Sequence, residues 1–478
     1  MIEALTRPRW PWIQIALGIY SSLVAVLPDT ARLALVAPMA LIGLAWWILA
    51  GPPDRWLLSF LCAAVLLPPL PIALGDSGPH PSLILAAMGA LVGLIRLRQW
   101  RVPMTGLGRS MIVLFFALML SLAPAALYSG LPVALGSLAR VLLFGISVYV
   151  FFYVTSGPLT PHDPVRAFRW TQNLFVAGAV AALFACVDFY YQFPAPAGFG
   201  PQFVWLNTGV FRRAQGLFYE ASTLGNFCAF FLVLVAITLT WPGKRPPLSR
   251  PLLLIGAAIL SAALVLSFSR ASLLNVLVAL VALIWLRRRQ LGFRRIGMGL
   301  LFAVIVGSVA THYFLPAFTE LYWNRISNSA AYLFTSTEGV LSGRLSSWNI
   351  LVDFLRENPF HALFGIGYKT LPYSTFLGQA VVGDNMYLTM LVETGMFGLA
   401  AFLVLNVSIL RVAYRAAGKS DLRASFFGTW VFCFWIGEMA QMLSGDLFTY
   451  WRVLPFYFWA LAVAARSADE HPLPRSVQ

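Results

Sequence analysis

The feature that most constrains this chain is a succession of long, continuous apolar runs. An α-helix needs about 20 apolar residues to cross a bilayer, and we count about fourteen runs near that length. Because the runs are continuous rather than alternating, they favour helices over a transmembrane barrel. They lie at residues 12–27, 31–50, 57–74, 81–95, 111–128, 133–155, 171–190, 217–240, 251–268, 271–286, 296–315, 386–410, 424–443 and 453–465.

The composition agrees with a membrane protein. Only 11% of the 478 residues are charged and 59% are hydrophobic, whereas soluble domains have about 25% charged residues. We therefore predict an all-α, polytopic integral membrane protein with about 12–14 transmembrane helices and one long, partly helical loop.

Three regions follow from the runs. We expect a helix bundle over residues 1–315 with a short extramembrane segment at 191–216, the large loop over residues 316–383, and the C-terminal helices and tail over residues 384–478. The first run follows Arg7 and Arg9 as in a signal peptide, but no small-residue cleavage site comes after it. We therefore expect this segment to be retained as the first helix.

The basic residues set the orientation. The net charge is +15, with 33 Lys and Arg, and most of these lie in alternate short loops. The positive-inside rule then puts both termini in the cytoplasm and the 191–216 and 316–383 segments on the opposite side. The charge is a topology signal, and we expect no nucleic-acid partner.

Metal and redox chemistry have no support in the spacing of Cys and His. The four cysteines each lie inside an apolar run and the five histidines are scattered. We expect buried thiols, no disulfide framework, no metal site and no cofactor. The cysteines are Cys62, Cys186, Cys228 and Cys433.

Arginines outside the cytoplasmic loops are the first site candidates. Arg140 lies inside a run, Arg270 lies at a tight hairpin between two runs, and Arg212 and Arg213 precede the 217–240 run. A charge near the membrane core is costly and indicates function, although an arginine that snorkels or caps a helix is the alternative. Guanidinium groups bind phosphate bidentately, so these residues predict an anionic substrate such as a lipid-linked pyrophosphate.

Carboxylates near the same membrane face could perform acid–base chemistry. Glu220 lies about one turn into a run, where it needs a partner such as an arginine. Asp384 precedes the 386–410 run and is either a helix N-cap or a general base toward a sugar hydroxyl, with Asn385 and Tyr387 orienting that hydroxyl. Glu393 is a structural partner of an arginine or a catalytic group. Lesser candidates are Asp188, His361, Glu438 and Asp446.

The large loop has a pattern of its own. Arg344 precedes an apolar stripe over residues 345–355 that includes Trp348 and predicts an amphipathic helix, which Asn358-Pro359 ends. The glycine-rich turn Phe364-Gly365-Ile366-Gly367-Tyr368 follows, without the strand–helix unit of a dinucleotide site.

Together these motifs resemble the O-antigen ligase and O-antigen polymerase superfamily of bacterial envelope membrane proteins. The resemblance runs from about Arg212 to Gly398. The matching elements are Arg212-Arg213 with Gly216 and Glu220-Ala221-Ser222, Ser269-Arg270, Gly343-Arg344 with Trp348, Pro359 with Gly365-Ile366-Gly367, Asn385 with Tyr387-Leu388, and Glu393-Thr394-Gly395.

This resemblance implies a metal-independent glycosyltransferase that takes a glycan from undecaprenyl diphosphate at the periplasmic face of the inner membrane. Ligases pass the glycan to lipid A-core, and polymerases pass it to another lipid-linked repeat unit. The family's acceptor-activating histidine is replaced here by Asp384, whose carboxylate can also accept a proton. This departure and the Glu220-Ala221-Ser222 element favour a polymerase of O-antigen or exopolysaccharide.

We therefore expect four catalytic residues, Arg213, Glu220, Arg270 and Asp384. Further substrate-binding residues would be Arg140, Arg212, Arg344, Trp348, Asn385, Tyr387 and Glu393. Expected partners are the undecaprenyl-diphosphate-linked glycan, inner-membrane lipids and a chain-length regulator. The alternatives are an O-antigen ligase, which differs in its acceptor, and a lipid-linked glycan flippase, which would line a midplane cavity with charge.

Overall fold

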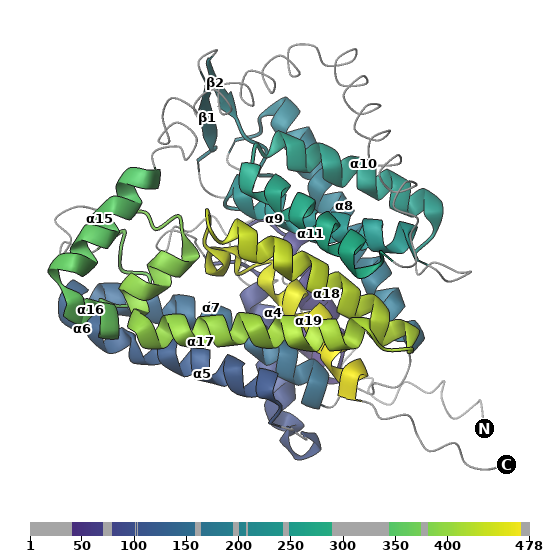
Figure 1. The fold of residues 1–478 in the computed structure, drawn as a ribbon. Helices are drawn as coiled ribbons and strands as arrows, with labels where there is room; N and C mark the ends of the chain where they lie inside the picture. The colour runs from purple at the N-terminus through teal and green to yellow at the C-terminus, as the bar shows by residue number, and fades with distance from the viewer. Residues whose placement is uncertain are drawn as a thin grey trace, which may run out of the picture.

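The structure is a computed structural model, which describes residues 41–69, 79–100, 102, 104–157, 164–194, 200–206, 209–241, 248–288, 344–373 and 381–469. These residues are mostly helical, with one short two-stranded hairpin (Figure 1). The helices are α3 (Arg55–Leu66), α4 (Ser82–Ile95), η3 (Leu97–Gln99), α5 (Gly106–Leu120), α6 (Leu122–Ser129), α7 (Leu131–Ser156), α8 (Pro164–Tyr191), α9 (Ala221–Leu239), α10 (Arg250–Leu266), α11 (Arg270–Leu286), α15 (Arg344–Glu357), α16 (Pro359–Phe364), α17 (Met386–Ala417), α18 (Leu422–Gln441), η5 (Leu447–Tyr450) and α19 (Leu454–Asp469).

Five helical stretches among the described residues are long and apolar enough to cross a membrane. Each of them coincides with a run predicted from the sequence, and so do several shorter apolar helices, which confirms an all-α polytopic membrane protein. The five stretches are Gly106–Ser129, Leu131–Ser156, Arg166–Tyr191, Ala221–Leu239 and Met386–Ala417. The predicted runs at 12–27 and 296–315, half of the 31–50 run and the end of the 57–74 run lie outside the described residues.

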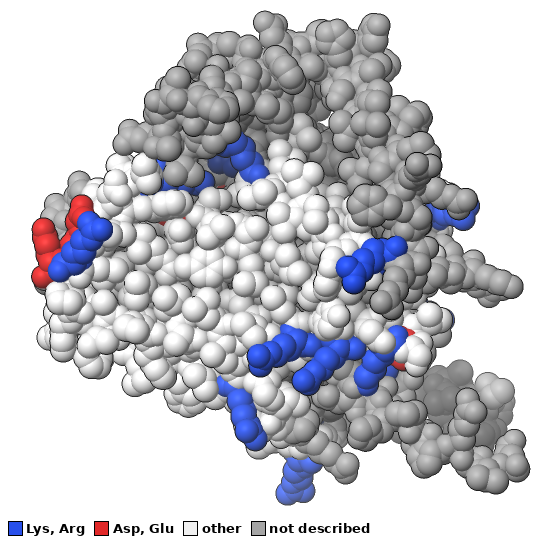
Figure 2. Space-filling model, in the orientation of Figure 1, with Lys and Arg blue, Asp and Glu red and all other residues white. Residues whose placement is uncertain are grey.

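The face of the bundle formed around α5 and α17 carries little charge. Figure 2 shows a broad uncharged area there, with charged side chains of both signs at one end and Lys and Arg toward the other. Large apolar side chains are exposed along these helices, among them Phe116, Leu120 and Phe397. An apolar surface of this breadth is what a lipid-facing helix presents.

The bundle core is formed by α18, which packs against α9, α11, α17 and α19. Side-chain amides and a carboxylate join these helices inside the core. Asn226 and Asn275 both donate to Glu438 Oε2 and to Gln441 Oε1, and Tyr457 donates to Asn226. All five side chains are buried. Interhelical hydrogen bonds of this kind hold membrane helices in one arrangement.

One end of the bundle, which we call the loop end, gathers the segments of the candidate site. There α8, α10 and α18 end, and α9, α11, α17 and α19 begin. Backbone hydrogen bonds join the connections, from Ala214 N to Leu266 O (2.9 Å) and from Met386 N to Met442 O (2.9 Å). The buried side chain of Arg452 also donates two hydrogen bonds here, from Nε to Ala64 O (2.7 Å) and from Nη1 to Leu217 O.

The segment between α8 and α9 contains a short antiparallel hairpin of β1 (Phe203–Leu206) and β2 (Gly209–Arg212). The chain then turns at Gly216, which has φ +55°. A Cβ at this position would lie 2.7 Å from Ala185 Cβ, so only glycine allows the turn to pack this closely on α8.

The predicted amphipathic helix of the large loop is confirmed as α15, which ends at Glu357 just before Asn358-Pro359. Its buried residues Leu351 and Phe354 form a small separate core with Ile366, Leu371 and Val392. The described part of the loop therefore packs on α17 through an apolar interface.

The glycine-rich turn after α16 packs into a break in α17. Gly395 has φ 71° and ψ −174°, which interrupts the helix. The break leaves two carbonyls available, and Ile366 N donates to Val392 O (3.0 Å) while Gly367 N donates to Glu393 O (2.8 Å). A Cβ on Gly395 would collide with the carbonyl oxygen of Leu363. The glycines of the two segments therefore fit against each other's backbone.

Candidate functional site

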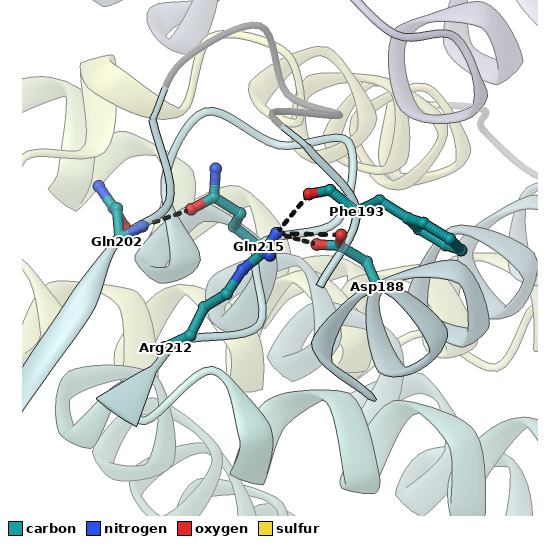
Figure 3. A network of polar contacts seen from close by, with 5 residues as sticks. All are labelled: Asp188, Phe193, Gln202, Arg212 and Gln215. Atoms are coloured by element: carbon teal, nitrogen blue, oxygen red, sulfur yellow. Dashed lines mark hydrogen bonds and ion pairs between the residues drawn. The ribbon is translucent and has the colours of Figure 1, made fainter. Parts of the chain in front are cut away.

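Arg212, a predicted substrate-binding residue, lies in a buried ion pair. Its Nη2 contacts Asp188 Oδ1 at 3.0 Å and Oδ2 at 3.2 Å and also donates to Phe193 O at 3.2 Å (Figure 3). The side chains are 7% and 0% exposed. The pair fastens β2 to the end of α8, so this geometry favours a structural role for Arg212.

Gln202 and Gln215 hold the same segment in place. Gln202 N donates to Gln215 Oε1 at 3.0 Å (Figure 3). The Gln202 side chain accepts from Ala221 N at 2.8 Å. This second bond satisfies one of the free N–H groups at the start of α9. The hairpin, the turn and α9 thus form one connected unit, which positions Arg213 and Glu220.

Arg213, next in sequence, points the other way. Its Nε donates to Ser267 O at 2.8 Å, which ties it to the turn between α10 and α11, and it stays partly exposed. Burial lowers the pKa of Arg213, and the neighbouring charges that act on it are Tyr450, Glu220 and Arg344. A guanidinium stays protonated after such a shift, because its ordinary pKa is far above neutral.

Glu220 occupies the N-cap position of α9 but makes no capping bond with its side chain. Its Oε2 accepts from Ser222 Oγ at 2.9 Å. Burial raises the pKa of Glu220, whereas Ser222, Lys369 and Arg213 lower it and Asp446 raises it further. The Glu220 carboxyl group therefore lies within electrostatic range of two cations and a second acid.

Arg270 is the first residue of α11 and is partly exposed at the loop end. Ser269 caps the helix by accepting from Ser272 N. A Cβ at Gly225 of α9 would lie 2.8 to 3.0 Å from Ser272, Ser267 and Ser269, so α9 packs closely on this turn. The hairpin predicted from the sequence therefore places Arg270 near the Arg213 segment.

Arg344 and Asp384 form an ion pair that joins the start of α15 to the start of α17. The Nε of Arg344 lies 3.0 Å from Asp384 Oδ2, and the side chains are 29% and 39% exposed. Trp348 follows one turn after Arg344, and among the described residues its buried Nε1 has no hydrogen-bond partner. Asp384 keeps access to solvent, as a proton acceptor requires.

Asn385 and Tyr387 have local partners. Asn385 is the N-cap of α17 and accepts from Tyr387 N (3.0 Å) and Leu388 N (3.1 Å). The hydroxyl of Tyr387 donates to Met439 O at 3.0 Å. The capping role considered for Asp384 thus belongs to Asn385, which leaves the carboxylate of Asp384 to Arg344.

Glu393 and Arg140, two further predicted binding residues, lie in α17 and α7. Glu393 is 1% exposed in the break of α17, and its Oε1 accepts from Leu371 N at 3.3 Å. Arg140 lies in α7 and is partly buried, and its guanidinium is within electrostatic range of Tyr368.

A second ion pair at the loop end was not predicted from the sequence. Lys369 Nζ contacts Asp446 Oδ2 and lies 3.2 Å from Thr449 Oγ1. The charges of Lys369 and Asp446 both lie within electrostatic range of the carboxyl groups of Glu220 and Glu393. The sequence signal was weak, because Lys369, directly after the glycine-rich turn, and Asp446 come from segments that are distant in the chain.

No group of three or more Cys, His, Asp or Glu residues able to hold a metal ion occurs within the described ranges. The charged groups at the loop end are mainly arginine, lysine and carboxylate side chains. This set is suited to binding an anionic phosphate and to moving a proton.

Comparison with known families agrees with this geometry. Residues 255–403 match the family model described as O-antigen ligase. Residues 255–403 of this chain are therefore similar to an O-antigen ligase domain. The match confirms the resemblance to the O-antigen ligase and polymerase superfamily, and it spans Arg270, Arg344, Asp384 and Glu393. No protein of curated function matches the chain in sequence.

The O-antigen ligase domain supplies only part of the loop end. Arg213 and Glu220 precede the match, and Asp446 follows it. The α8–α9 segment and the α18–α19 connection therefore complete the candidate site from outside the domain.

Proposed function

We propose that this protein is a polymerase of a bacterial surface polysaccharide, acting at the periplasmic face of the inner membrane. The observation that carries the proposal is the Arg344–Asp384 pair at one end of a membrane bundle. Its arginine lies within electrostatic range of Arg213, which is itself within range of Glu220. A cationic group next to a solvent-accessible carboxylate suits a donor with a diphosphate and an acceptor with a hydroxyl group.

In the proposed reaction, Arg213, Arg270 and Arg344 bind the diphosphate of an undecaprenyl-linked glycan. Their guanidinium groups neutralise the charge that builds on the leaving group, which is the task that a metal ion performs in other glycosyltransferases. Arg344 exchanges its bond to Asp384 for one to the diphosphate, and this exchange releases the carboxylate.

Asp384 then accepts the proton of the acceptor hydroxyl. The acceptor oxygen bonds to the anomeric carbon, the bond between that carbon and the diphosphate oxygen breaks, and undecaprenyl diphosphate leaves with the electron pair. In a polymerase the acceptor is a second lipid-linked repeat unit. A ligase would use lipid A-core instead, and the description of the matched family favours it as the second candidate.

The test is reconstitution of the full-length protein in liposomes that contain one lipid-linked repeat unit. A ladder of products with release of undecaprenyl diphosphate is expected. Product that forms only after lipid A-core is added would identify a ligase. No transfer under either condition, combined with movement of the lipid-linked unit across the bilayer, would identify a flippase and overturn the proposal.

A further inference from the structure

Lys369 lies in a backbone conformation that is uncommon for a residue other than glycine. Its φ is 55°, between the docked Gly367 and the buried Leu371. A left-handed lysine costs free energy that the surrounding structure must offset, and such conformations cluster at binding and active sites. Contacts around Lys369 must therefore stabilise this conformation.

Glu393 holds this conformation. Its carboxylate accepts from Leu371 N and also faces the backbone N–H of Lys369. Its second oxygen, Oε2, is buried without a hydrogen-bond partner among the described residues. The buried acid thus fastens the turn around Lys369 to the break in α17, and it contacts the backbone of the lysine segment rather than an arginine.

The conformation directs the ammonium group of Lys369 into the candidate site. There it pairs with Asp446 and reaches Thr449, and both side chains of the pair keep some exposure, 15% and 11%. The charge of Lys369 is also within electrostatic range of the Glu220 carboxyl group, and so is the charge of Arg213. A lysine ammonium is a compact point charge that binds phosphate, and this one adds a second cation to Arg213 near Glu220.

We propose that Lys369 is a further binding residue for the diphosphate of the donor, that Glu393 is its positioning residue, and that Asp446 holds the ammonium until the donor binds. This inference rests on the function proposed above. It differs from a structural ion pair in one respect, because Asp446 competes with the substrate for Lys369.

The experiment measures binding of farnesyl diphosphate, a short prenyl diphosphate, to the full-length protein in nanodiscs of neutral lipid. Lys369→Met should weaken binding by about tenfold or more, since a charge-assisted bond is lost. Asp446→Asn should tighten binding, because the amide keeps the cap on Phe448 N but no longer attracts the ammonium. Lys419→Met, at the opposite end of α17, is the matched control and should bind as the wild type does.

Glu393 is tested by a pair of substitutions in the same assay. Glu393→Gln retains an oxygen that can accept from the backbone and should bind nearly as well as the wild type, whereas Glu393→Leu should weaken binding as much as Lys369→Met does. A structural role alone would not produce the opposite effects expected at positions 369 and 446.

The outcomes separate this inference from the proposed function. Unchanged binding in Lys369→Met, or equal weakening in Lys369→Met and Asp446→Asn, would overturn the inference alone. If the binding pattern holds but the liposomes make no glycan product, the proposed function fails and the diphosphate site remains. A wild-type protein that does not bind farnesyl diphosphate would overturn both.

Discussion

At the residue scale, the two neighbouring arginines of the α8–α9 segment have opposite surroundings. Arg212 is buried against Asp188, and Arg213 is partly exposed beside Glu220. The alternation of side chains along β2 and the residue after it accounts for this difference, because consecutive residues of a strand point to opposite faces. A pair that looks like one motif in the sequence therefore serves two purposes.

The buried pair predicts a stability effect. Arg212→Met and Asp188→Leu should each destabilise the protein by about 3–5 kcal/mol, because each leaves an uncompensated buried charge. The double variant should lose less than the sum of the two single losses. Thermal unfolding in detergent measures the effect, and Arg356→Met, in an exposed pair with Asp353, should change little. Two single variants as stable as the wild type would contradict a structural Arg212.

Substitution of Asp384 should affect catalysis and leave the stability of the protein unchanged. Asp384→Asn should slow glycan transfer by about 100-fold or more, since general base catalysis is typically worth that much. The initial rate of product formation in liposomes measures it. Asp353→Asn removes an exposed carboxylate from the same loop and should leave the rate unchanged. A fully active Asp384→Asn variant would show that another group accepts the proton.

The raised pKa of Glu220 should make the stability of the protein depend on pH. Burial raises its pKa above the ordinary 4.5, so folding disfavours the ionised form. The contribution of Glu220 to the free energy of unfolding is therefore fully present below its ordinary pKa. This contribution is lost as the pH rises through the raised pKa of the folded protein. Melting temperatures over the acidic to neutral range should show that Glu220→Gln loses this decline. Parallel curves for the two proteins would show that the Glu220 pKa is not raised.

At the element scale, the break in α17 controls the large loop. Gly395→Ala forces a Cβ against the Leu363 carbonyl in a left-handed conformation, so we expect the glycine-rich turn to detach and the melting temperature to fall. Gly136→Ala in α7 is the control, because nothing lies near its added Cβ, and an alanine in a helix is stabilising by up to about 1 kcal/mol. Equal melting temperatures in both variants would contradict the role of the break.

Sequence reasoning found the elements better than it found their partners. The apolar runs located the helices, and the stripe around Trp348 located α15, because helical periodicity is a local property. Local sequence could not show that Asp188 faces Arg212, or that Lys369 faces Asp446, since these contacts exist only after the bundle assembles. The cap at Asn385 rather than Asp384 was a difference of one residue, which is within the usual error of a helix boundary.

At the scale of the whole molecule, the proposed function requires the loop end to face the periplasm. After the four native cysteines are replaced, Ser346→Cys in α15 should react with a membrane-impermeant maleimide in intact spheroplasts. Ser420→Cys, between α17 and α18, should react only after the membrane is permeabilised. Both positions are exposed in the described structure. The reverse labelling pattern would place the site in the cytoplasm and exclude the proposed donor orientation.

The polar core around Glu438 bears on how the chain enters the membrane during synthesis. Helix α18 spans 20 residues yet carries Arg423, Glu438 and Gln441, so it is less apolar than the five clear spans. A single helix of this kind partitions poorly into lipid, because its polar groups lack partners there. We therefore expect α18 to integrate only after α9 and α11 are in place, with Asn226 and Asn275 receiving its carboxylate, so that late biogenesis depends on helices made much earlier.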